Sequence, residues 1–199
     1  MMNMIKSLFI HMTFNMSLLN EPSEVFSFLQ KKFDPMNLSP DYRVKKTSTP
    51  IHQTEIVDVL CKSHISEYGK APSNNRLALS WAQIALENNR GKKIWNNNIG
   101  NQGPFRMDQE YYHHLRKGWP YRSFSNLEDS GRSYWRVISK CSSALRAFDD
   151  GDPARAAISL KNCNYFGTDV SGYTRTLNSL YYEAKSRVIP KVGCNTTLK

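Results

Sequence analysis

One carboxylate, Glu87, stands at the end of an apolar segment of this 199-residue chain and is the strongest candidate for chemistry. Apolar residues recur before it at three- and four-residue steps, at Leu77, Trp81, Ile84 and Ala85. This spacing predicts a helix over residues 77–89, ended by Gly91, with those side chains on its buried stripe. Ser80, Gln83 and Glu87 form a second line beside the stripe, so Glu87 would border the core and still reach a cleft.

The expected surroundings of Glu87 bear on its protonation. Partial burial and a place in the last helical turn, where the helix dipole disfavours negative charge, would both raise its pKa. Arg90, Lys92 and Lys93 would lower it, so the sequence leaves the balance open. A carboxylic acid that stays protonated near neutral pH can protonate a leaving oxygen, as glycoside hydrolysis requires. The alternative is a solvated carboxylate that happens to end a helix.

The segments on either side must position this helix. Upstream, a helical pattern that stops at Gly69 is carried by Ile56, Val57, Leu60 and Ile65. Downstream, residues 93–124 are rich in Asn, in turn-forming Gly and Pro, and in scattered aromatics. This composition predicts loops and short strands, with residues 95–107 and 119–125 as the best strand candidates.

The chain then returns to helix. Ser125-x-x-Glu128 has the pattern of a capping box, in which both side chains satisfy backbone groups at a helix start. Asp152 before Pro153 predicts another helix start. A last helical stripe is formed by Tyr173, Leu177, Leu180, Tyr181 and Ala184.

Three segments resemble, in the same order, the motifs of bacterial N-acetylglucosaminidases of the lysozyme-like superfamily. The first is LSWAQIALENNRGK followed by NNNIGNQ, which is similar to the helix that carries the catalytic Glu and to the opening of the small lobe. The second is YRSFSNLEDSGRSYWRVI, and the third is NYFGTDVSGYTRTLNSLY. Together they cover about residues 76–182.

The resemblance has two departures. Asn88-Asn89-Arg90 replaces the small-Gly-aromatic run that usually follows the catalytic Glu. Ile99 stands directly before Gly100, where the family often has Leu-Phe. Substrate preference within the superfamily is therefore open, because lytic transglycosylases and muramidases share the Glu-bearing helix.

The resemblance implies roles for particular residues. Glu87 would be the general acid, and Tyr165 would line the cleft near the cleaved bond. Asn98 and Gly100 would shape the approach of the small lobe to the sugar. Gln83 and Phe124 are further substrate-binding candidates; an aromatic ring such as Phe124 can stack on a sugar face or form the core of the small lobe.

A second acid is harder to assign. Glu128 matches the acid of the middle motif and is the candidate for a second catalytic residue, although the capping box offers it a structural role. Asp108, Glu110 and Asp129 are weaker candidates. Three mechanisms stay open: a base that activates water, assistance by the substrate's 2-acetamido group, and attack by the sugar's 6-hydroxyl to give an anhydro product.

Composition limits the partners. The formal net charge of +10 favours anionic partners, including the polymers of a bacterial envelope. The basic residues are dispersed and form no nucleic-acid-binding signature, so nucleic acid is not expected as a partner. No cofactor or metal is expected either, because the chain lacks a phosphate-binding glycine loop and His113-His114 has no HExxH or Cys partner.

The four cysteines and the N-terminus leave more than one interpretation. Cys61, Cys141, Cys163 and Cys194 form no CxxC pair; they allow three disulfide connectivities or free buried thiols. The apolar run at residues 5–19 is too short and broken for a membrane span, so stable membrane insertion is not expected. It fits a poor signal peptide or an amphipathic first helix.

We therefore predict a mainly α (α+β) protein: a lysozyme-like helical domain with a small β or irregular lobe beside an active-site cleft. An N-terminal helical arm and linker would span residues 1–48, the glycoside hydrolase domain 49–188 and a tail 189–199. The predicted activity is cleavage of the β-1,4 glycan strands of peptidoglycan in the bacterial cell envelope, periplasmic or extracellular, with delivery by a virion or lysis system as another route. The alternative of another class is a non-catalytic glycan-binding or structural envelope protein. The oligomeric state is open.

Overall fold

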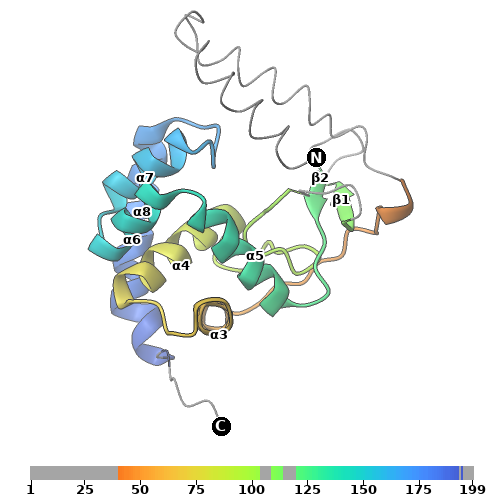
Figure 1. The fold of residues 1–199 in the computed structure, drawn as a ribbon, viewed down its shortest axis with the longest axis horizontal. Coiled ribbons are helices and arrows are strands. Elements are labelled where there is room, and N and C mark those ends of the chain that lie inside the picture. Colours follow the sequence, from red (N-terminus) through yellow and green to blue (C-terminus); the bar gives the residue numbers. More distant parts are fainter. Residues whose placement is uncertain (1–39, 104–108, 114–119, 193, 195–199) are drawn as a thin grey trace, which may run out of the picture. The chain divides into compact units, whose positions relative to one another are not determined.

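The computed structural model describes residues 40–103, 109–113, 120–192 and 194 (Figure 1). This part of the chain is mainly helical, with six α-helices and one two-stranded antiparallel sheet, as expected for the fold class. The helices are α3 (Gln53–Tyr68), α4 (Asn74–Asn88), α5 (Leu127–Ser139), α6 (Ser142–Asp150), α7 (Pro153–Asn162) and α8 (Val170–Glu183); the strands are β1 (Tyr111–His113) and β2 (Pro120–Arg122). Several expected features lie outside the described residues: the N-terminal helix, Asp108, His114, and the aromatic residues Phe105 and Trp119 of the two strand candidates.

Helix α4 is the element around which the other helices are arranged. It packs against α3, α6 and α8, and its apolar stripe is buried. The helix starts earlier than its apolar pattern indicates, because Ser73 caps it by accepting a hydrogen bond from the Arg76 backbone N–H. It ends before Gly91, because Asn89 takes the left-handed conformation with φ 53° and its N–H closes the last turn.

Helices α3 and α5 lie against each other at close range. Gly131 makes this possible, since an added Cβ there would lie 2.6 Å from Ser63 Oγ and 3.0 Å from Val59 Cγ1. Trp135 is fully buried in the same contact, and its indole nitrogen donates to the Leu60 carbonyl oxygen at 3.0 Å.

The remaining helices follow the sequence pattern closely. Gly69 ends α3 in the left-handed conformation, as predicted. Asp152 caps α7, with Pro153 in its first turn, which confirms the second predicted helix start. The predicted stripe of α8 and its continuation is also confirmed, since all five of its members are buried: Tyr173, Leu177, Leu180, Tyr181 and Ala184.

The small lobe differs in detail from the expectation. Tyr111–His113 pairs with Pro120–Arg122, so the second predicted strand candidate is confirmed in part. The first candidate is wrong over residues 95–103, which form turns and irregular structure apart from an isolated bridge between Trp95 and Ser48. Its asparagines explain this: Asn96 and Asn97 adopt φ of 48° and 57°, a left-handed conformation that Asn tolerates and that a strand excludes.

The segment before α3 completes the lobe. The backbone N–H of Val44 donates to the Tyr111 carbonyl at 2.9 Å, and that of Thr49 donates to Ile94 at 2.9 Å. The compact unit that holds all described residues accordingly begins at Pro40.

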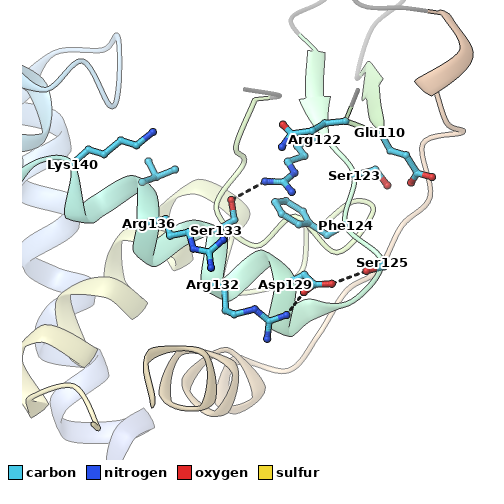
Figure 2. A pocket seen from close by; sticks show the side chains of 12 residues that line it. Glu110, Arg122, Ser123, Phe124, Ser125, Asp129, Arg132, Ser133, Arg136 and Lys140 are labelled. Atoms are coloured by element: carbon cyan, nitrogen blue, oxygen red, sulfur yellow. Dashed lines mark hydrogen bonds and ion pairs between the residues drawn. The ribbon is translucent and has the colours of Figure 1, made fainter. Parts of the chain in front are cut away.

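A groove runs between α5 and the lobe, with a volume of about 570 Å³ (Figure 2). One wall is a stripe of α5 at three- and four-residue steps, formed by Asp129, Arg132, Ser133, Arg136, Val137 and Lys140. The opposite wall comes from the lobe and the turn after it, with Gln109, Glu110, Arg122, Ser123, Phe124 and Ser125.

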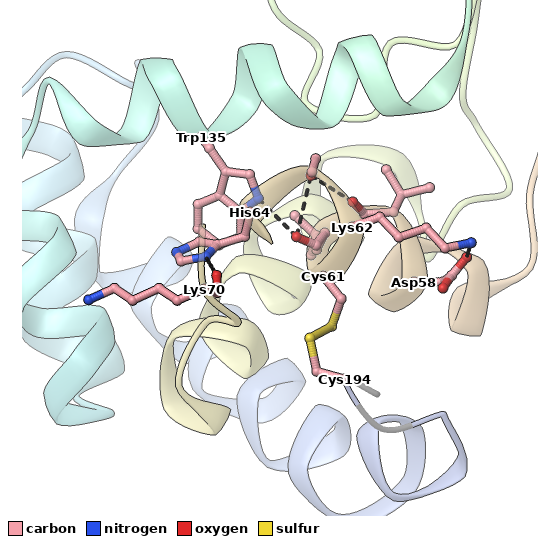
Figure 3. Close-up of a disulfide and its surroundings, with 10 residues drawn as sticks. Asp58, Cys61, Lys62, His64, Lys70, Trp135 and Cys194 are labelled. Carbon is pink, nitrogen blue, oxygen red and sulfur yellow. Dashed lines mark hydrogen bonds and ion pairs between the residues drawn. A yellow bond between two sulfur atoms is a disulfide. The ribbon is translucent and has the colours of Figure 1, made fainter. Parts of the chain in front are cut away.

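All four cysteines form disulfides, so the alternative of free thiols is wrong. The Cys141–Cys163 disulfide links the start of α6 to the end of α7. The second disulfide joins Cys61 of α3 to Cys194 near the C-terminus (Figure 3). Disulfides persist in oxidising compartments, which indicates an extracytoplasmic protein. Among the described residues, no helix is long and apolar enough to cross a membrane.

Candidate functional site

Glu87 lies in the last turn of α4 and is partly buried, as the helical pattern predicts. The Asn-rich turn that follows the helix, residues 96–101, contacts Glu87 directly: Asn101 donates from its side-chain amide to the Glu87 backbone carbonyl oxygen at 2.9 Å. One of the carbonyl groups that a helix end leaves without an intrahelical partner is thereby satisfied. The Asn-rich turn is therefore tied directly to the residue that bears the candidate acid.

Tyr173, in the first turn of α8, is the residue that contacts the Glu87 carboxylate. Its hydroxyl donates to Glu87 Oε1 in a long hydrogen bond of 3.5 Å. The Tyr173 ring is 6% exposed and is stacked on Phe166, with ring centroids 3.6 Å apart and planes 5° from parallel. Phe166 comes from the α7–α8 loop, so this loop holds the tyrosine in place beside the carboxylate.

Tyr165, one residue earlier in the same loop, connects it to the Asn-rich turn. Its hydroxyl donates to the Gly100 carbonyl oxygen, again in a long bond of 3.5 Å. Burial and the nearby charge of Glu87 raise the pKa of Tyr165, and the same two causes raise the pKa of Tyr173. Both hydroxyls thus remain protonated across the physiological range and serve as hydrogen-bond donors.

Several buried polar groups of α4 and α5 lie close to these tyrosines without well-formed hydrogen bonds among the described residues. Gln83 is one helical turn before Glu87, fully buried, and neither polar atom of its amide makes a hydrogen bond within the described structure. It is near enough to affect the pKa of both Tyr165 and Tyr173. Ser80 Oγ and the Tyr134 hydroxyl are buried close to each other, without the geometry of a full hydrogen bond among the described residues. Buried polar groups of this kind are costly unless water or a ligand satisfies them.

Burial raises the pKa of the Glu87 carboxyl above its ordinary value, and the hydrogen bond from Tyr173 opposes this rise. The sequence suggests that the basic residues after Glu87 lower its pKa, but Arg90 is engaged elsewhere. Its guanidinium turns away to form a bidentate ion pair with Glu183 of α8, at 2.8 and 2.7 Å. Glu87 is therefore held toward its protonated form, the state that a general acid requires.

Asn98 and Gly100 act on the shape of the turn. Asn98 is fully buried, and its amide donates to the carbonyl oxygens of Gln102 and Arg122 at 2.8 and 2.9 Å. Gly100 is enclosed: an added Cβ would lie 3.1 Å from the Gln102 amide nitrogen and 3.2 Å from the Tyr134 ring. Asn98 thus supports the turn from inside, and Gly100 offers its carbonyl oxygen to Tyr165.

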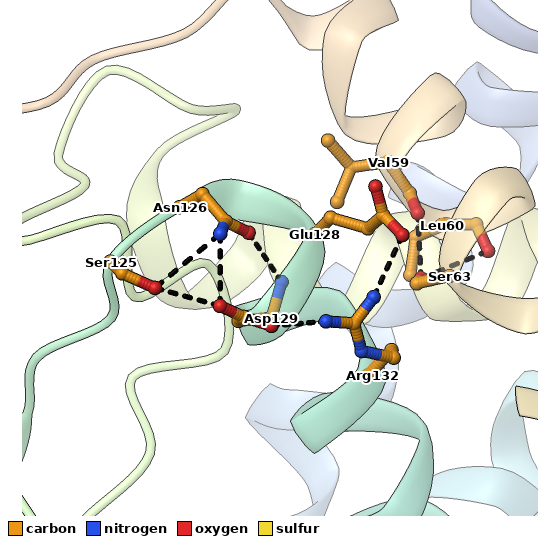
Figure 4. A network of polar contacts seen from close by, with 8 residues as sticks. All are labelled: Val59, Leu60, Ser63, Ser125, Asn126, Glu128, Asp129 and Arg132. Atoms are coloured by element: carbon orange, nitrogen blue, oxygen red, sulfur yellow. Dashed lines mark hydrogen bonds and ion pairs between the residues drawn. The ribbon is translucent and has the colours of Figure 1, made fainter. Parts of the chain in front are cut away.

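Glu128 lies elsewhere (Figure 4). The capping box predicted for it is wrong by one residue, because α5 begins at Leu127 and Asn126 is the cap that accepts from the Asp129 N–H. The Glu128 side chain is half exposed and pairs with Arg132 at 2.7 Å, on the side of α5 that borders α3. No described contact joins Glu128 to Glu87.

The other predicted residues lie in the groove beside α5. Phe124 is 5% exposed, and the Arg122 guanidinium carbon lies over its ring, 4.4 Å from the centroid. Glu110 and Asp129 line the same groove, whereas Glu87 is not among its lining residues. Phe124 is therefore placed by the structure in the groove, apart from the surroundings of Glu87.

Sequence reasoning missed Tyr173 and Tyr134 as parts of the site. Both were visible only as aromatics in helical patterns, for which core packing is the ordinary role. The polar residues Ser80 and Gln83, which lie beside the apolar stripe of α4, could have indicated these tyrosines. Buried polar side chains need polar groups opposite them.

Comparisons with protein families, with curated proteins and with solved structures find no match for this chain. Within the described residues, no cluster of three or more His, Cys, Asp or Glu side chains could hold a metal ion.

Proposed function

We propose that this chain is a glycoside hydrolase of lysozyme-like type that cleaves the β-1,4 glycan of peptidoglycan, as an N-acetylglucosaminidase with Glu87 as its general acid. One observation carries the proposal. Tyr173, at the start of α8 and 86 residues from Glu87 in the chain, donates to the Glu87 carboxyl group. The α7–α8 loop that supports it contacts the Asn-rich turn through Tyr165 and Gly100, and the same turn contacts the Glu87 backbone carbonyl through Asn101. These segments bear the first and the third motifs of the resemblance.

The chemistry follows from the environment of the carboxyl group. A glycosidic oxygen is a poor leaving group, and an acid must protonate it as the bond breaks. Burial favours the protonated form of Glu87. The residue is only partly buried, and the proposal requires that a substrate reaches its carboxyl group. Tyr173 donates to the carboxylate that remains after proton transfer, which stabilises the charge formed in the reaction.

The described residues also bear on the second catalytic group. None of their carboxylates is among the causes that shift the pKa of Glu87, and Glu128 is engaged with Arg132. Two of the three open mechanisms need no second protein carboxylate: assistance by the substrate's 2-acetamido group and attack by its 6-hydroxyl. We favour the first, because it gives the reducing product of a glucosaminidase.

The proposed setting is the bacterial cell envelope. Two disulfides fit an oxidising compartment, and a net charge of +10 favours adhesion to an anionic wall.

The products of digestion test the proposal. Purified peptidoglycan would be incubated with the disulfide-bonded chain, and the fragments identified by mass spectrometry. We expect new reducing N-acetylglucosamine ends. Reducing muramic acid ends would instead indicate a muramidase, and anhydro ends a transglycosylase. An unchanged polymer would contradict the proposal and favour a non-catalytic glycan-binding protein.

A further inference from the structure

The groove beside α5 has a chemical character of its own. Its α5 wall extends from Asp129 to Lys140, which corresponds to about 17 Å along the helix axis. Four cationic side chains line it, Arg122, Arg132, Arg136 and Lys140, together with the two carboxylates of Glu110 and Asp129. Hydroxyl groups of Ser123, Ser125 and Ser133 complete the lining. The groove is thus polar, net positive and long enough for an extended ligand.

Arg122 is the cation at the centre of the inference. Its guanidinium lies against the Phe124 ring and donates from Nη1 to Ser133 Oγ at 3.1 Å. Ser133 in turn donates to Gln102 Oε1 at 2.6 Å, so the serine hydroxyl that receives Arg122 is itself fixed. Figure 2 shows the Arg122 side chain reaching from β2 toward α5 across the groove.

No described carboxylate forms an ion pair with Arg122. This distinguishes it from Arg132, which pairs with Glu128 and Asp129, and from Arg136, which pairs with Glu67 at 2.8 Å. Burial lowers the pKa of Arg122, and the negative charge of Asp129 opposes this effect without forming an ion pair with the guanidinium. A partly desolvated, unpaired cation is unfavourable by itself and is relieved when an anion binds.

The two carboxylates of the groove narrow the choice of ligand. Glu110 and Asp129 would repel a polymer with closely spaced negative charges, such as a polyphosphate or a nucleic acid. They accept hydrogen bonds, as do the serine hydroxyls, and sugar hydroxyls supply donors in abundance. A ligand with isolated carboxylates separated by neutral sugars satisfies both sets of groups.

We propose that this groove binds an acidic glycan, with one carboxylate of the glycan held by Arg122 and neighbouring sugar hydroxyls held by Asp129 and Glu110. Arg122 presents a planar fork of N–H donors that matches a carboxylate in two parallel hydrogen bonds. The groove does not include Glu87, so the proposal does not depend on catalysis. It would hold even if the chain proved to be a glycan-binding protein without hydrolytic activity.

Calorimetric titration of the full-length chain at low salt tests this. The probe is a hexasaccharide of alternating glucuronate and N-acetylglucosamine, and the neutral comparison is a hexamer of N-acetylglucosamine. We expect the acidic probe to bind more tightly than the neutral one. Arg122→Gln should weaken binding of the acidic probe by roughly tenfold or more and leave the neutral hexamer unaffected.

Further variants guard against misfolding and unspecific charge effects. Arg136→Gln replaces a side chain that is 65% exposed, so it should fold normally and still weaken binding severalfold. Arg155→Gln removes the same charge from α7, outside the groove, and should bind like the wild type.

Three results would overturn the proposal. The first is equal binding of the acidic probe by Arg122→Gln, Arg136→Gln and the wild type. The second is an equal loss in Arg155→Gln, which would indicate attraction by net charge alone. The third is tighter binding of a single-stranded oligonucleotide than of the acidic glycan, which would mean that charge density and not sugar chemistry selects the ligand.

Discussion

The Tyr173 hydroxyl donates to the Glu87 carboxylate across 86 residues of sequence, at an oxygen–oxygen distance of 3.5 Å. The two residues belong to helices that pack along each other, α8 and α4, so the contact is set by the core of the protein. Burial of Glu87 and the Tyr173 bond act in opposite directions on the pKa of the carboxyl group. The pair therefore tunes the acidity of the proposed proton donor, and the tuning can be measured.

Tyr173→Phe should move the pH profile of hydrolysis toward higher pH. The hydrogen bond from Tyr173 lowers the pKa of Glu87, so its removal raises that pKa further. A general acid works only while protonated, and the alkaline limb of kcat/KM reports its pKa in the free enzyme. The stacking on Phe166 can persist, because the ring is kept.

The matched control is Tyr182→Phe, which removes a hydroxyl from a side chain that is 60% exposed in the same helix. Its pH profile should coincide with that of the wild type. An alkaline limb that stays in place or moves to lower pH in Tyr173→Phe would contradict the role given to this bond.

Glu87→Gln should stabilise the fold at neutral and alkaline pH. Because the pKa of Glu87 is raised in the folded state, its contribution to stability is fully present below the ordinary value of 4.5 and is lost as pH rises through the folded pKa. Glutamine carries no charge, so it avoids this loss. Thermal unfolding at pH 8 and pH 4 would show a gain at the higher pH that shrinks at the lower pH.

Glu55→Gln serves as the control for that measurement, because Glu55 is an exposed acid in the first turn of α3. It should show no such gain at pH 8. A lower unfolding temperature of Glu87→Gln at pH 8 would mean that the carboxylate is better solvated than the structure indicates.

Gly131→Ala should destabilise the protein by about 1–3 kcal/mol, because the new methyl group would overlap Ser63 and force α3 and α5 apart. Gly172→Ala provides the matched change in another helix, where the nearest atom to an added Cβ is Asp169 Oδ2 at 3.6 Å. That variant should be neutral or more stable by up to about 1 kcal/mol, since Ala favours helix over Gly. Chemical denaturation measures both, and equal effects would contradict the close packing at Gly131.

Loss of the Cys141–Cys163 disulfide should lower the free energy of unfolding by about 3 kcal/mol, the magnitude for a loop of roughly this size. The double replacement Cys141→Ser with Cys163→Ser tests this by denaturation without reductant. Reductant should then destabilise the double variant further, because Cys61–Cys194 remains to be broken. A wild-type transition that reductant leaves unchanged would show that the bridges do not form in solution.

The helices could be predicted because their stripes and caps are local. Asp152 lies beside the segment that it caps, and four of the five residues of the last stripe lie within α8. The capping of α5 shows the limit of such reasoning. Ser125 and Asn126 are adjacent residues, either of which can cap a helix, and the structure uses Asn126.

The site was predictable only in part. The position of Glu87 at the edge of the α4 stripe follows from helical periodicity. Its contact with Tyr173 depends on how α8 packs against α4, and the same periodicity assigns Tyr173 to the core. The strand predicted at the Asn-rich turn does not form, because Asn96 and Asn97 adopt left-handed backbone conformations. A sequence does not show directly which asparagines adopt this conformation.

The central claim is that Glu87 donates the proton that breaks the glycan. Clearing of a suspension of purified cell walls by the wild type, by Glu87→Gln and by Glu55→Gln tests it most directly. We expect the wild type and Glu55→Gln to clear the walls at equal rates, and Glu87→Gln to be slower by at least about a hundredfold, the usual contribution of a general acid. Clearing by Glu87→Gln at the wild-type rate would contradict the claim.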